Sequence, residues 1–239
     1  MAISIIGTGR AVPAARVTNE DLAKYIDTSD EWIRSHAGIG ARHIADEDTA
    51  ASDLGAAAAL EALEMAVRRG AVGEKTAGEL AETLDLIILG STTQDYYGHP
   101  ATACIVQDKI GAKNAAAMDI TAACSGFVYG LESAAGLLAL DPRRRRALVI
   151  GAEILSRLID WEDRGSCILF GDGAGAVLIE KNGDPGAEAG VSAGRGLLRT
   201  VLAADGSGWE KLVLRRGGSR NPWKRGEVVE KPPHIEMDG

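Results

Sequence analysis

The sequence predicts an α/β fold in which helices cover both faces of a largely parallel sheet. Short β-rich runs alternate along the chain with long alanine-rich amphipathic segments, and such alternation is typical of parallel sheets. Two of the runs, residues 84–92 and 145–155, are almost continuously apolar, as strands buried on both faces are. The composition agrees, because 30 glycines and only 4% aromatic residues suit closely packed layers.

The N-terminal third begins with a strand over residues 3–7. Residues 7–12, GTGRAV, then form a turn. Thr18 is a suitable N-cap for a helix running towards Tyr25. A longer alanine-rich helix begins near Thr49 or Ser52 and ends at Gly70. The polar residues 71–83 are expected to form a surface connection.

The middle of the chain repeats the strand and helix pattern. The expected elements are a helix over 99–111, a strand over 115–124, a helix over 125–140, a strand over 145–155, and two strand pieces broken by a Gly-rich turn over 167–181. After Lys181 the sequence becomes rich in Gly, Pro, Arg and Asp, with one strand expected at 210–216. We therefore divide the chain into 1–181 and a loop-rich lobe, 182–239.

Several functional classes are disfavoured. A formal charge of −8 argues against nucleic-acid binding. The N-terminus lacks the basic and apolar regions of a signal peptide, and no apolar run approaches the length of a membrane helix. Three cysteines without C-x-x-C spacing and four histidines without an H-x-x-x-H pair give no metal site or disulfide framework. A soluble cytoplasmic protein is expected.

Cys124 carries the strongest chemical signal. It lies where a buried strand is expected to end and a helix to begin, followed by Ser125 and Gly126. The free N–H groups and positive dipole end of a helix favour a thiolate at such a position, as in a nucleophile elbow. A buried structural cysteine remains an equal alternative on position alone. Cys104 and Cys167 are interpreted as structural, the first within a helix and the second on a strand.

Five segments then resemble one family. They are TSDEWI (28–33), GIGARH (38–43), DITAACSGFVYGL (119–131), DRGSCILFGDGAGAVL (163–178) and ADGSGWEKL (204–212). Together, over the whole chain, the sequence resembles β-ketoacyl-acyl carrier protein synthase III of the thiolase superfamily. The resemblance implies a thiolase-like fold of αβαβα layers, of which this chain supplies the first half and a connecting lobe.

The resemblance also implies an activity. Proteins similar to this one transfer an acyl group from acyl-coenzyme A to a cysteine, here Cys124, and condense it with malonyl-acyl carrier protein, releasing carbon dioxide. It implies no cofactor, and a homodimer for the complete enzyme. The residues that it assigns are Thr28, Trp32 and Arg164 for coenzyme A, and His99 and Phe170 for the acyl pocket. Taken singly, such a Trp is more often a core residue and such an Arg a solvated turn residue.

Two positions depart from the family pattern. His36 stands where relatives often have an arginine that contacts a coenzyme A phosphate, and Arg34 is a possible substitute. His99 precedes Pro100 where a large apolar residue is common, so a changed pocket is expected and the acyl chain is not assigned. Arg143–Arg146 could dock an acidic carrier protein, but a solvated connection is the preferred interpretation. The segment 170–178 lacks the features of a phosphate loop and is expected to be a tight turn.

In the family, a His and an Asn that follow the segment matching residues 234–239 drive decarboxylation. Residues 1–239 are therefore expected to accept an acyl group without completing the condensation. Two alternatives stay open. One is a non-catalytic subunit that packs against a condensing-enzyme partner. The other is a starter-unit synthase of a polyketide-type pathway.

Overall fold

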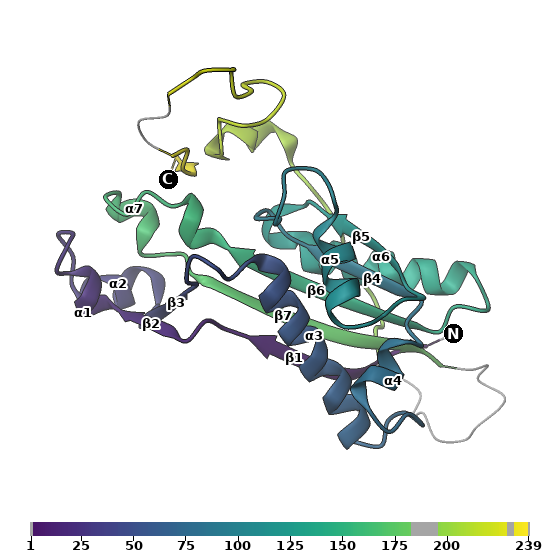
Figure 1. Ribbon diagram of the computed structural model, residues 1–239. Helices are drawn as coiled ribbons and strands as arrows, with labels where there is room; N and C mark the ends of the chain where they lie inside the picture. The colour runs from purple at the N-terminus through teal and green to yellow at the C-terminus, as the bar shows by residue number, and fades with distance from the viewer. Residues whose placement is uncertain (1, 183–195, 229–231, 239) are drawn as a thin grey trace. The chain divides into compact units, whose positions relative to one another are not determined.

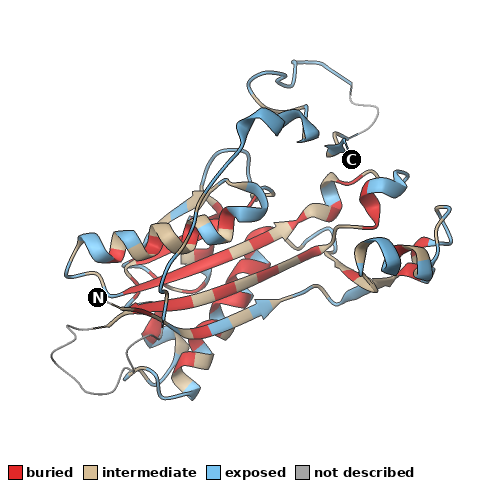
Figure 2. Ribbon diagram, turned by 180° about the vertical axis from the view of Figure 1, so that it is seen from behind, coloured by how far each residue is buried: buried red, intermediate tan, exposed pale blue. Residues whose placement is uncertain are grey.

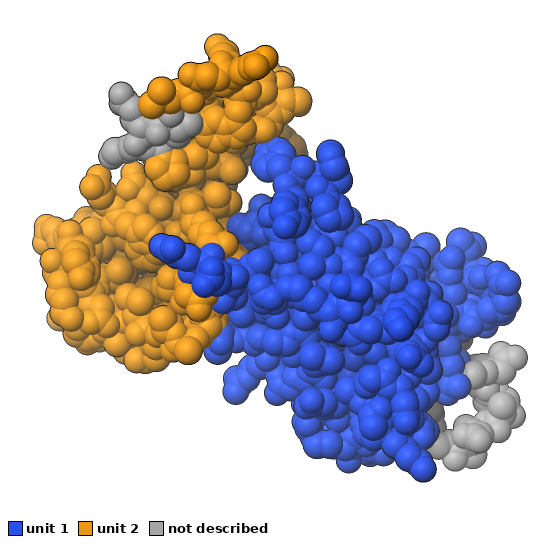
Figure 3. Space-filling model, viewed as in Figure 1, with its two compact units in different colours: residues 1–12, 47–153, 173–202 blue, residues 13–46, 154–172, 203–239 orange. Residues whose placement is uncertain are grey.

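The structure, a computed structural model, describes residues 2–182, 196–228 and 232–238 (Figure 1). The chain forms two compact units, each assembled from three separate segments (Figure 3). Unit 1 comprises Met1–Val12, Glu47–Glu153 and Gly173–Leu202, and unit 2 comprises Pro13–Asp46, Ile154–Asp172 and Ala203–Gly239. These units are defined by contacts within the chain and do not test the predicted boundary after residue 181, which stays a prediction.

Unit 1 is built on a sheet with the strand order β1-β7-β6-β4-β5. The strands are β1 (Ile3–Ala11), β4 (Leu86–Gly90), β5 (Ala116–Ile120), β6 (Arg146–Ile154) and β7 (Asp172–Lys181). Strand β4 pairs in parallel with β5 and with β6, as predicted. Strand β1 pairs antiparallel with β7, so the sheet is mixed at this edge.

The Gly-rich segments of the sequence are strands rather than turns. Residues 7–11 continue β1 after a bulge between Ile5 and Gly7, and residues 172–181 form one unbroken strand, β7. Both predicted turns are therefore wrong. The glycines of β1 instead admit helix α3, since a Cβ on Gly7 or Gly9 would lie 2.1 Å from a backbone oxygen of that helix. In a strand, glycine often marks such a close approach.

The helices of unit 1 cover both faces of the sheet, as predicted. They are α3 (Ala51–Arg68), α4 (Ala77–Ala81), α5 (Thr102–Lys109) and α6 (Gly126–Leu140), preceded by the 3-10 turn η1 (Ala123–Ser125). All five residues of β4 are buried, and Figure 2 shows buried residues along the sheet. Ile88 packs in one cluster with Leu138 of α6. Leu89 lies against Gly55 of α3, beside Val106 of α5. Successive side chains of β4 thus point to opposite helical layers.

Two expectations about the helices need correction. Residues 71–83 contain α4, whose Leu80 and Ala81 are fully buried, so this segment is not simply a surface connection. Among the described residues, Ala123–Leu140 is long and apolar enough to cross a membrane by length and composition alone. Within this window 22% of the residues are buried, among them Ala134 and Leu138, which pack on the sheet of unit 1.

Unit 2 is made of short elements around a small core. They are β2 (Ala15–Thr18), α1 (Asn19–Leu22), α2 (Asp30–Ala37), β3 (Ala41–Ile44), η2 (Leu155–Leu158), α7 (Arg164–Cys167), η3 (Gly206–Lys211), β8 (Leu212–Val213) and β9 (Glu236–Met237). The core contains Leu22, Ile33, Ile159, Cys167 and Ile168. Thr18 caps α1 in a capping box with Asp21, as predicted. The strand expected at 210–216 is reduced to the two residues of β8. Of the lobe 182–239, residues 183–195, 229–231 and 239 lie outside the described residues.

Candidate functional site

Cys124 lies at the predicted junction of strand and helix. Strand β5 ends at Ile120, Cys124 is the middle residue of η1, and α6 begins at Gly126. Its neighbour Ala123 has a φ of 45°, which makes it the one described non-glycine residue with a positive φ. A bend that places an alanine in this region is strained, and such strain is common beside functional residues. The turn leaves Cys124 exposed, so the buried structural alternative is wrong for this residue.

A contact between two glycines sets the start of α6. A Cβ added to Gly90, the last residue of β4, would lie 2.7 Å from the carbonyl carbon of Gly126 and 3.0 Å from the nitrogen of Phe127. Only hydrogen at this position lets the backbone of α6 approach the strand so closely. The Gly90–Gly126 contact therefore fixes where α6 begins relative to β4. It also fixes the position of the turn that carries Cys124.

Cys124 opens into a cavity of about 330 Å³ within unit 1. Its lining residues are Gly90, Ala123, Cys124, Phe127, Gly151, Ala152, Glu153, Gly173, Ala174 and Gly175. They come from the ends of β4 and β6, the start of α6 and the start of β7, and most lack large side chains. Phe127 provides an apolar wall and Glu153 a carboxylate. The cavity thus has room for a small group attached to the sulfur.

Sequence reasoning missed both Phe127 and Glu153. Phe127 follows Cys124 by three residues, a spacing that places two residues on one side of a helical turn. Glu153 is near the end of β6, next to β4 in the sheet. Ligands of parallel sheets bind at the carboxyl ends of the strands. A polar residue near the end of an apolar strand, as Glu153 is, was therefore the sequence signal for a residue at the site.

In unit 2 the structure brings Trp32 and Arg164 together, as the resemblance implied. The guanidinium carbon of Arg164 lies 4.5 Å from the centroid of the Trp32 ring, within the range of a cation–π contact. Each residue is in the first turn of a capped helix. The Ser29 hydroxyl accepts a hydrogen bond from the backbone N–H of Trp32. Asp163 caps α7, and its pKa is lowered by hydrogen bonds from the Ser166 hydroxyl and the Gly165 N–H.

Thr28 precedes this pair in the same motif. Its hydroxyl oxygen is buried and has no hydrogen-bond partner within the described part of the chain, which is uncommon for a buried polar atom. Indole and guanidinium groups both stack on planar heteroaromatic rings. Arg164 and His36 both lie against the Trp32 ring, and Arg164 is exposed. The guanidinium plane of Arg164, backed by the indole, is therefore a surface that suits a nucleotide base.

A buried polar network joins the two helices that carry Trp32 and Arg164. The Arg42 guanidinium donates to the Ile168 carbonyl oxygen directly after α7 and to the Asn19 side-chain oxygen, both at 3.0 Å. Asn19 in turn donates to Asp30 in the first turn of α2 at 2.8 Å. Burial lowers the pKa of Arg42, and the hydrogen bond from Asn19 leads the causes that lower the pKa of Asp30. These hydrogen bonds fix the position of α2 relative to α7.

The two residues considered for a phosphate contact have other partners. The His36 ring stacks on Trp32 at a centroid distance of 4.2 Å, and His36 Nδ1 lies 2.8 Å from the Trp32 carbonyl oxygen. Arg34 Nε donates to both carboxylate oxygens of Asp30, at 2.9 and 2.8 Å. In this structure His36 supports the indole ring, and Arg34 is engaged within α2.

The two residues predicted for the acyl pocket are not among those that line the Cys124 cavity. His99 is exposed on the segment between β4 and α5, and the lining of the Cys124 cavity does not include it. Phe170 packs against the core of unit 2. Cys124 and His99 thus belong to unit 1, and the coenzyme A residues and Phe170 belong to unit 2.

The arginine run 143–146 serves the fold of unit 1. Arg143 pairs with Asp141, Arg144 donates to the Leu137 carbonyl oxygen, and Arg145 pairs with Glu180. Arg146 is buried, so the expected solvated connection is wrong for that residue.

The other two cysteines differ in environment. Cys104 is within α5, as predicted, and is exposed. Cys167 ends helix α7 rather than lying on a strand, because the chain turns around Asp163 there. It is fully buried, and burial raises the pKa of its thiol. A raised pKa and lack of access both make Cys167 an unreactive core residue.

Comparisons with known proteins bear on this arrangement. The family model described as 3-oxoacyl-[acyl-carrier-protein (ACP)] synthase III matches residues 118–206, which include Cys124. A β-ketoacyl-[acyl-carrier-protein] synthase III of Syntrophomonas wolfei subsp. wolfei is 43% identical over 239 residues, a match covering 100% of this chain and 65% of that protein. The chain thus spans just under two thirds of the length of this relative.

Solved structures agree with the sequence matches. A crystal structure of a 3-oxoacyl-(acyl-carrier-protein) synthase III has a TM-score of 0.79 at 30% identity, covering 100% of this chain and 68% of that one. The priming β-ketosynthase from the R1128 polyketide biosynthetic pathway has a TM-score of 0.78 at 29% identity, covering 99% of this chain and 63% of that one. These matches confirm the predicted thiolase-like fold class. The chain belongs to the β-ketoacyl-[acyl-carrier-protein] synthase III family.

Proposed function

We propose that Cys124 accepts an acyl group from acyl-coenzyme A, as the first step of a condensation with malonyl-acyl carrier protein that begins fatty acid synthesis in the cytoplasm. One observation carries the proposal: Cys124 is exposed at the first turn leading into α6 and opens into a cavity large enough for a small acyl group. The positive end of the α6 dipole favours negative charge at this place. The family of the chain supports the same assignment.

In the proposed step, the Cys124 sulfur attacks the thioester carbonyl carbon. A carbon–sulfur bond forms to Cys124, and the bond to the coenzyme A sulfur breaks. Coenzyme A leaves with the electron pair of that bond and takes up the proton lost by the cysteine. Condensation would then transfer the acyl group to the malonyl carbon, release carbon dioxide and regenerate the thiol. For residues 1–239 we propose the acyl-transfer step, since the resemblance assigns decarboxylation to motifs that follow residue 239.

Incubation with acetyl-coenzyme A tests this step. The intact mass is expected to rise by one acetyl group, and peptide mapping is expected to place that group on Cys124. The Cys124→Ser variant is expected to show no such increase, while Cys104→Ser, which removes the other exposed thiol, behaves like the wild type. A folded wild-type protein that stays unmodified, or is modified only at Cys104, would contradict the proposal and favour a non-catalytic subunit.

The nucleotide part of the proposal has its own test. Trp32→Ala is expected to slow acylation by acetyl-coenzyme A about 10- to 100-fold, since stacking on a base contributes about 1–3 kcal/mol. Acylation by S-acetyl-N-acetylcysteamine, which has no nucleotide, is expected to stay at the wild-type rate. Trp223→Ala is a matched control, because Trp223 also has an arginine above its ring, Arg216 at 5.0 Å. Equal slowing with both donors would assign Trp32 to the fold alone.

A second candidate keeps the chemistry and changes the acyl group. The likeness to a priming β-ketosynthase of a polyketide pathway favours this alternative. We propose to compare acyl-coenzyme A donors of increasing length and branching in the same mass assay. A preference for acetyl groups supports fatty acid initiation, whereas a preference for longer or branched groups supports a starter-unit synthase.

A further inference from the structure

The lining of the Cys124 cavity carries a negative charge. Among the described residues that line this cavity, only Glu153 has a formally charged side chain. The others are glycine and alanine residues, Phe127 and Cys124 itself. None of these side chains supplies a cation that would balance a carboxylate. A charged group that enters the cavity therefore meets the field of Glu153 without compensation from the rest of the lining.

The carboxylate of Glu153 is held by uncharged donors. Its Oε1 accepts a hydrogen bond from the backbone N–H of Thr92 at 2.8 Å. Its Oε2 accepts from the hydroxyl of Thr92 at 3.1 Å and from the hydroxyl of Thr93 at 2.6 Å. Hydrogen bonds to an ionised acceptor are among the stronger ones in proteins. They fix the position of the carboxylate without pairing it with a cation in the described part of the chain.

This charge lies close enough to Cys124 to affect a bound group. Thr92 follows Gly90, another lining residue, by two positions. A round space of about 330 Å³ would be roughly 9 Å across, which is close to the ~8 Å over which charges act at physiological ionic strength. The opposing field comes from the N-terminus of α6, which is equivalent to about half a positive charge. The full charge of Glu153 exceeds it.

We infer that Glu153 is a specificity-determining residue that selects against negatively charged acyl groups on Cys124 and so favours uncharged ones. The inference rests on the proposed function and deepens it, because it assigns the charge class of the acyl group. Butyryl and succinyl groups illustrate the difference. They have the same number of carbon atoms, but succinyl ends in a carboxylate, which the charge of Glu153 repels.

Glu153→Gln tests the inference, because glutamine removes the charge and can keep the contacts. Its oxygen can accept from the Thr92 N–H, and threonine hydroxyls can accept from its nitrogen. The full chain is treated with three methanethiosulfonates, the uncharged methyl reagent, the anionic sulfonatoethyl reagent and the cationic trimethylammonioethyl reagent. The Cys124 sulfur forms a disulfide with each, and methanesulfinate leaves with the electron pair. Peptide mapping measures the rates at Cys124 and Cys104 separately.

The ratio of the anionic to the cationic rate at Cys124 is expected to rise about tenfold in Glu153→Gln. A unit charge about 6 Å away changes the rate of a charged reagent about threefold even at the dielectric constant of water, and in opposite directions for the two reagents. Added salt is expected to reduce the difference between variant and wild type. The ratio at Cys104 in the same molecule is expected to stay constant.

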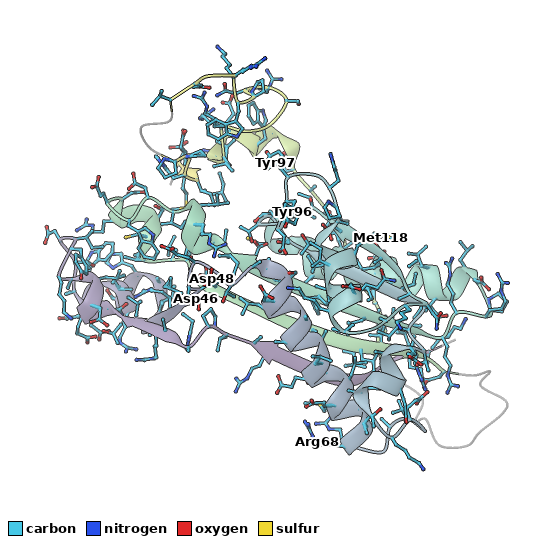
Figure 4. The ribbon with its side chains drawn as sticks, in the orientation of Figure 1. Asp46, Asp48, Arg68, Tyr96, Tyr97 and Met118 are labelled. Carbon is cyan, nitrogen blue, oxygen red and sulfur yellow. The ribbon has the colours of Figure 1, made fainter. Side chains whose placement is uncertain are left out.

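Two further variants separate charge from structure. Thr93→Val removes the shortest hydrogen bond to Glu153 at nearly constant volume and keeps the carboxylate, so the ratio at Cys124 is expected to stay within twofold of wild type. Glu64→Gln changes the net charge of the chain by the same amount as Glu153→Gln. Glu64 is an exposed residue of α3 that pairs with Arg68, which Figure 4 labels near the end of that helix. This variant is expected to leave the ratio unchanged.

The outcomes separate the inference from the proposed function. A ratio that changes less than twofold in Glu153→Gln overturns the inference, and so does an equal change in Thr93→Val. If Glu153→Gln does not fold, the salt dependence of the wild type decides. The ratio at Cys124 rises with added salt if Glu153 dominates, and a constant or falling ratio overturns the inference. A tenfold shift in Glu153→Gln while acetyl-coenzyme A leaves the wild type unmodified supports the role of Glu153 and rejects the acyl-coenzyme A proposal.

Discussion

Replacing Arg146 with methionine is expected to destabilise unit 1 by about 3–5 kcal/mol at pH 7, the usual cost of removing one partner from a buried ion pair. Arg146 Nε donates to Glu180 and its Nη1 donates to Glu74, each at 2.5 Å, and Nη1 also donates to the Thr83 hydroxyl at 2.7 Å. The side chains of Arg146, Glu180 and Glu74 are only 7%, 10% and 21% exposed. Methionine fills the space but removes the cation that pairs with Glu74 and leaves Glu180 with Arg145 as its partner.

The pH dependence of this effect follows from Glu74. The hydrogen bond from Arg146 is the leading cause that lowers the pKa of Glu74 below its ordinary value of 4.5. A lowered pKa contributes stability that is present above pH 4.5 and is lost as the pH falls through the folded-state value. Protonation also removes the cost of an unpaired Glu74 in the variant. The difference between wild type and Arg146→Met is therefore expected to be largest near neutral pH and to shrink below about pH 4.5.

Urea denaturation at several pH values measures this difference. The matched control is Arg143→Met, which removes a neighbouring arginine whose side chain is 89% exposed. Exposed ion pairs contribute little, so this variant is expected to unfold at the wild-type urea concentration. Equal destabilisation by the two substitutions, or a difference that grows as the pH falls, would contradict the assignment of Arg146 as the centre of a buried network.

Replacing Gly90 with alanine is expected both to destabilise unit 1 and to slow modification of Cys124. The new methyl group would lie 2.7 Å from the carbonyl carbon of Gly126. The opposing atoms belong to the backbone of α6, so the helix must move away from β4. Overpacking of this kind costs about 1–3 kcal/mol. The displaced helix start carries the turn with Cys124, and we expect the methyl methanethiosulfonate rate at Cys124 to fall together with the stability.

A second glycine provides the control for this prediction. Gly136 lies within α6, and a Cβ added there would meet no atom within 4 Å. Gly136→Ala is expected to stabilise the protein by up to about 1 kcal/mol, since alanine favours the helix, and to leave the Cys124 rate unchanged. Thermal denaturation and the thiol assay test both variants. A Gly90→Ala protein with wild-type Tm and wild-type Cys124 reactivity would show that the glycine contact does not position the turn.

The sequence by itself determined the local elements that depend on neighbouring residues. The apolar run 84–92 predicted a strand buried on both faces, Thr18 predicted a capped helix, and Cys124 was placed correctly between a strand and a helix. These predictions succeed because hydrophobic periodicity and capping act over a few residues. The motifs around Trp32 and Arg164 likewise indicated two residues that the fold brings to 4.5 Å from each other.

Only the tertiary structure decided features that depend on contacts between distant segments. The segment 170–178 was expected to form a turn, yet from Asp172 onward it belongs to the strand β7, which lies between β1 and β6 in the sheet. Arg146 was expected in a solvated connection, and its burial depends on Glu74 and Glu180, which lie 72 and 34 residues away. The environment of Glu153 also depends on distant segments, because its partners Thr92 and Thr93 are some 60 residues distant in sequence.

The physical reason is the same in these cases. A buried charge or a close backbone approach is stable only when a particular partner lies opposite it, and the sheet order selects that partner. Cys124 itself shows both contributions. The sequence placed it at the start of a helix, and the packing of Gly90 against Gly126, with Phe127 and Glu153 in the lining, gave it an open cavity of about 330 Å³.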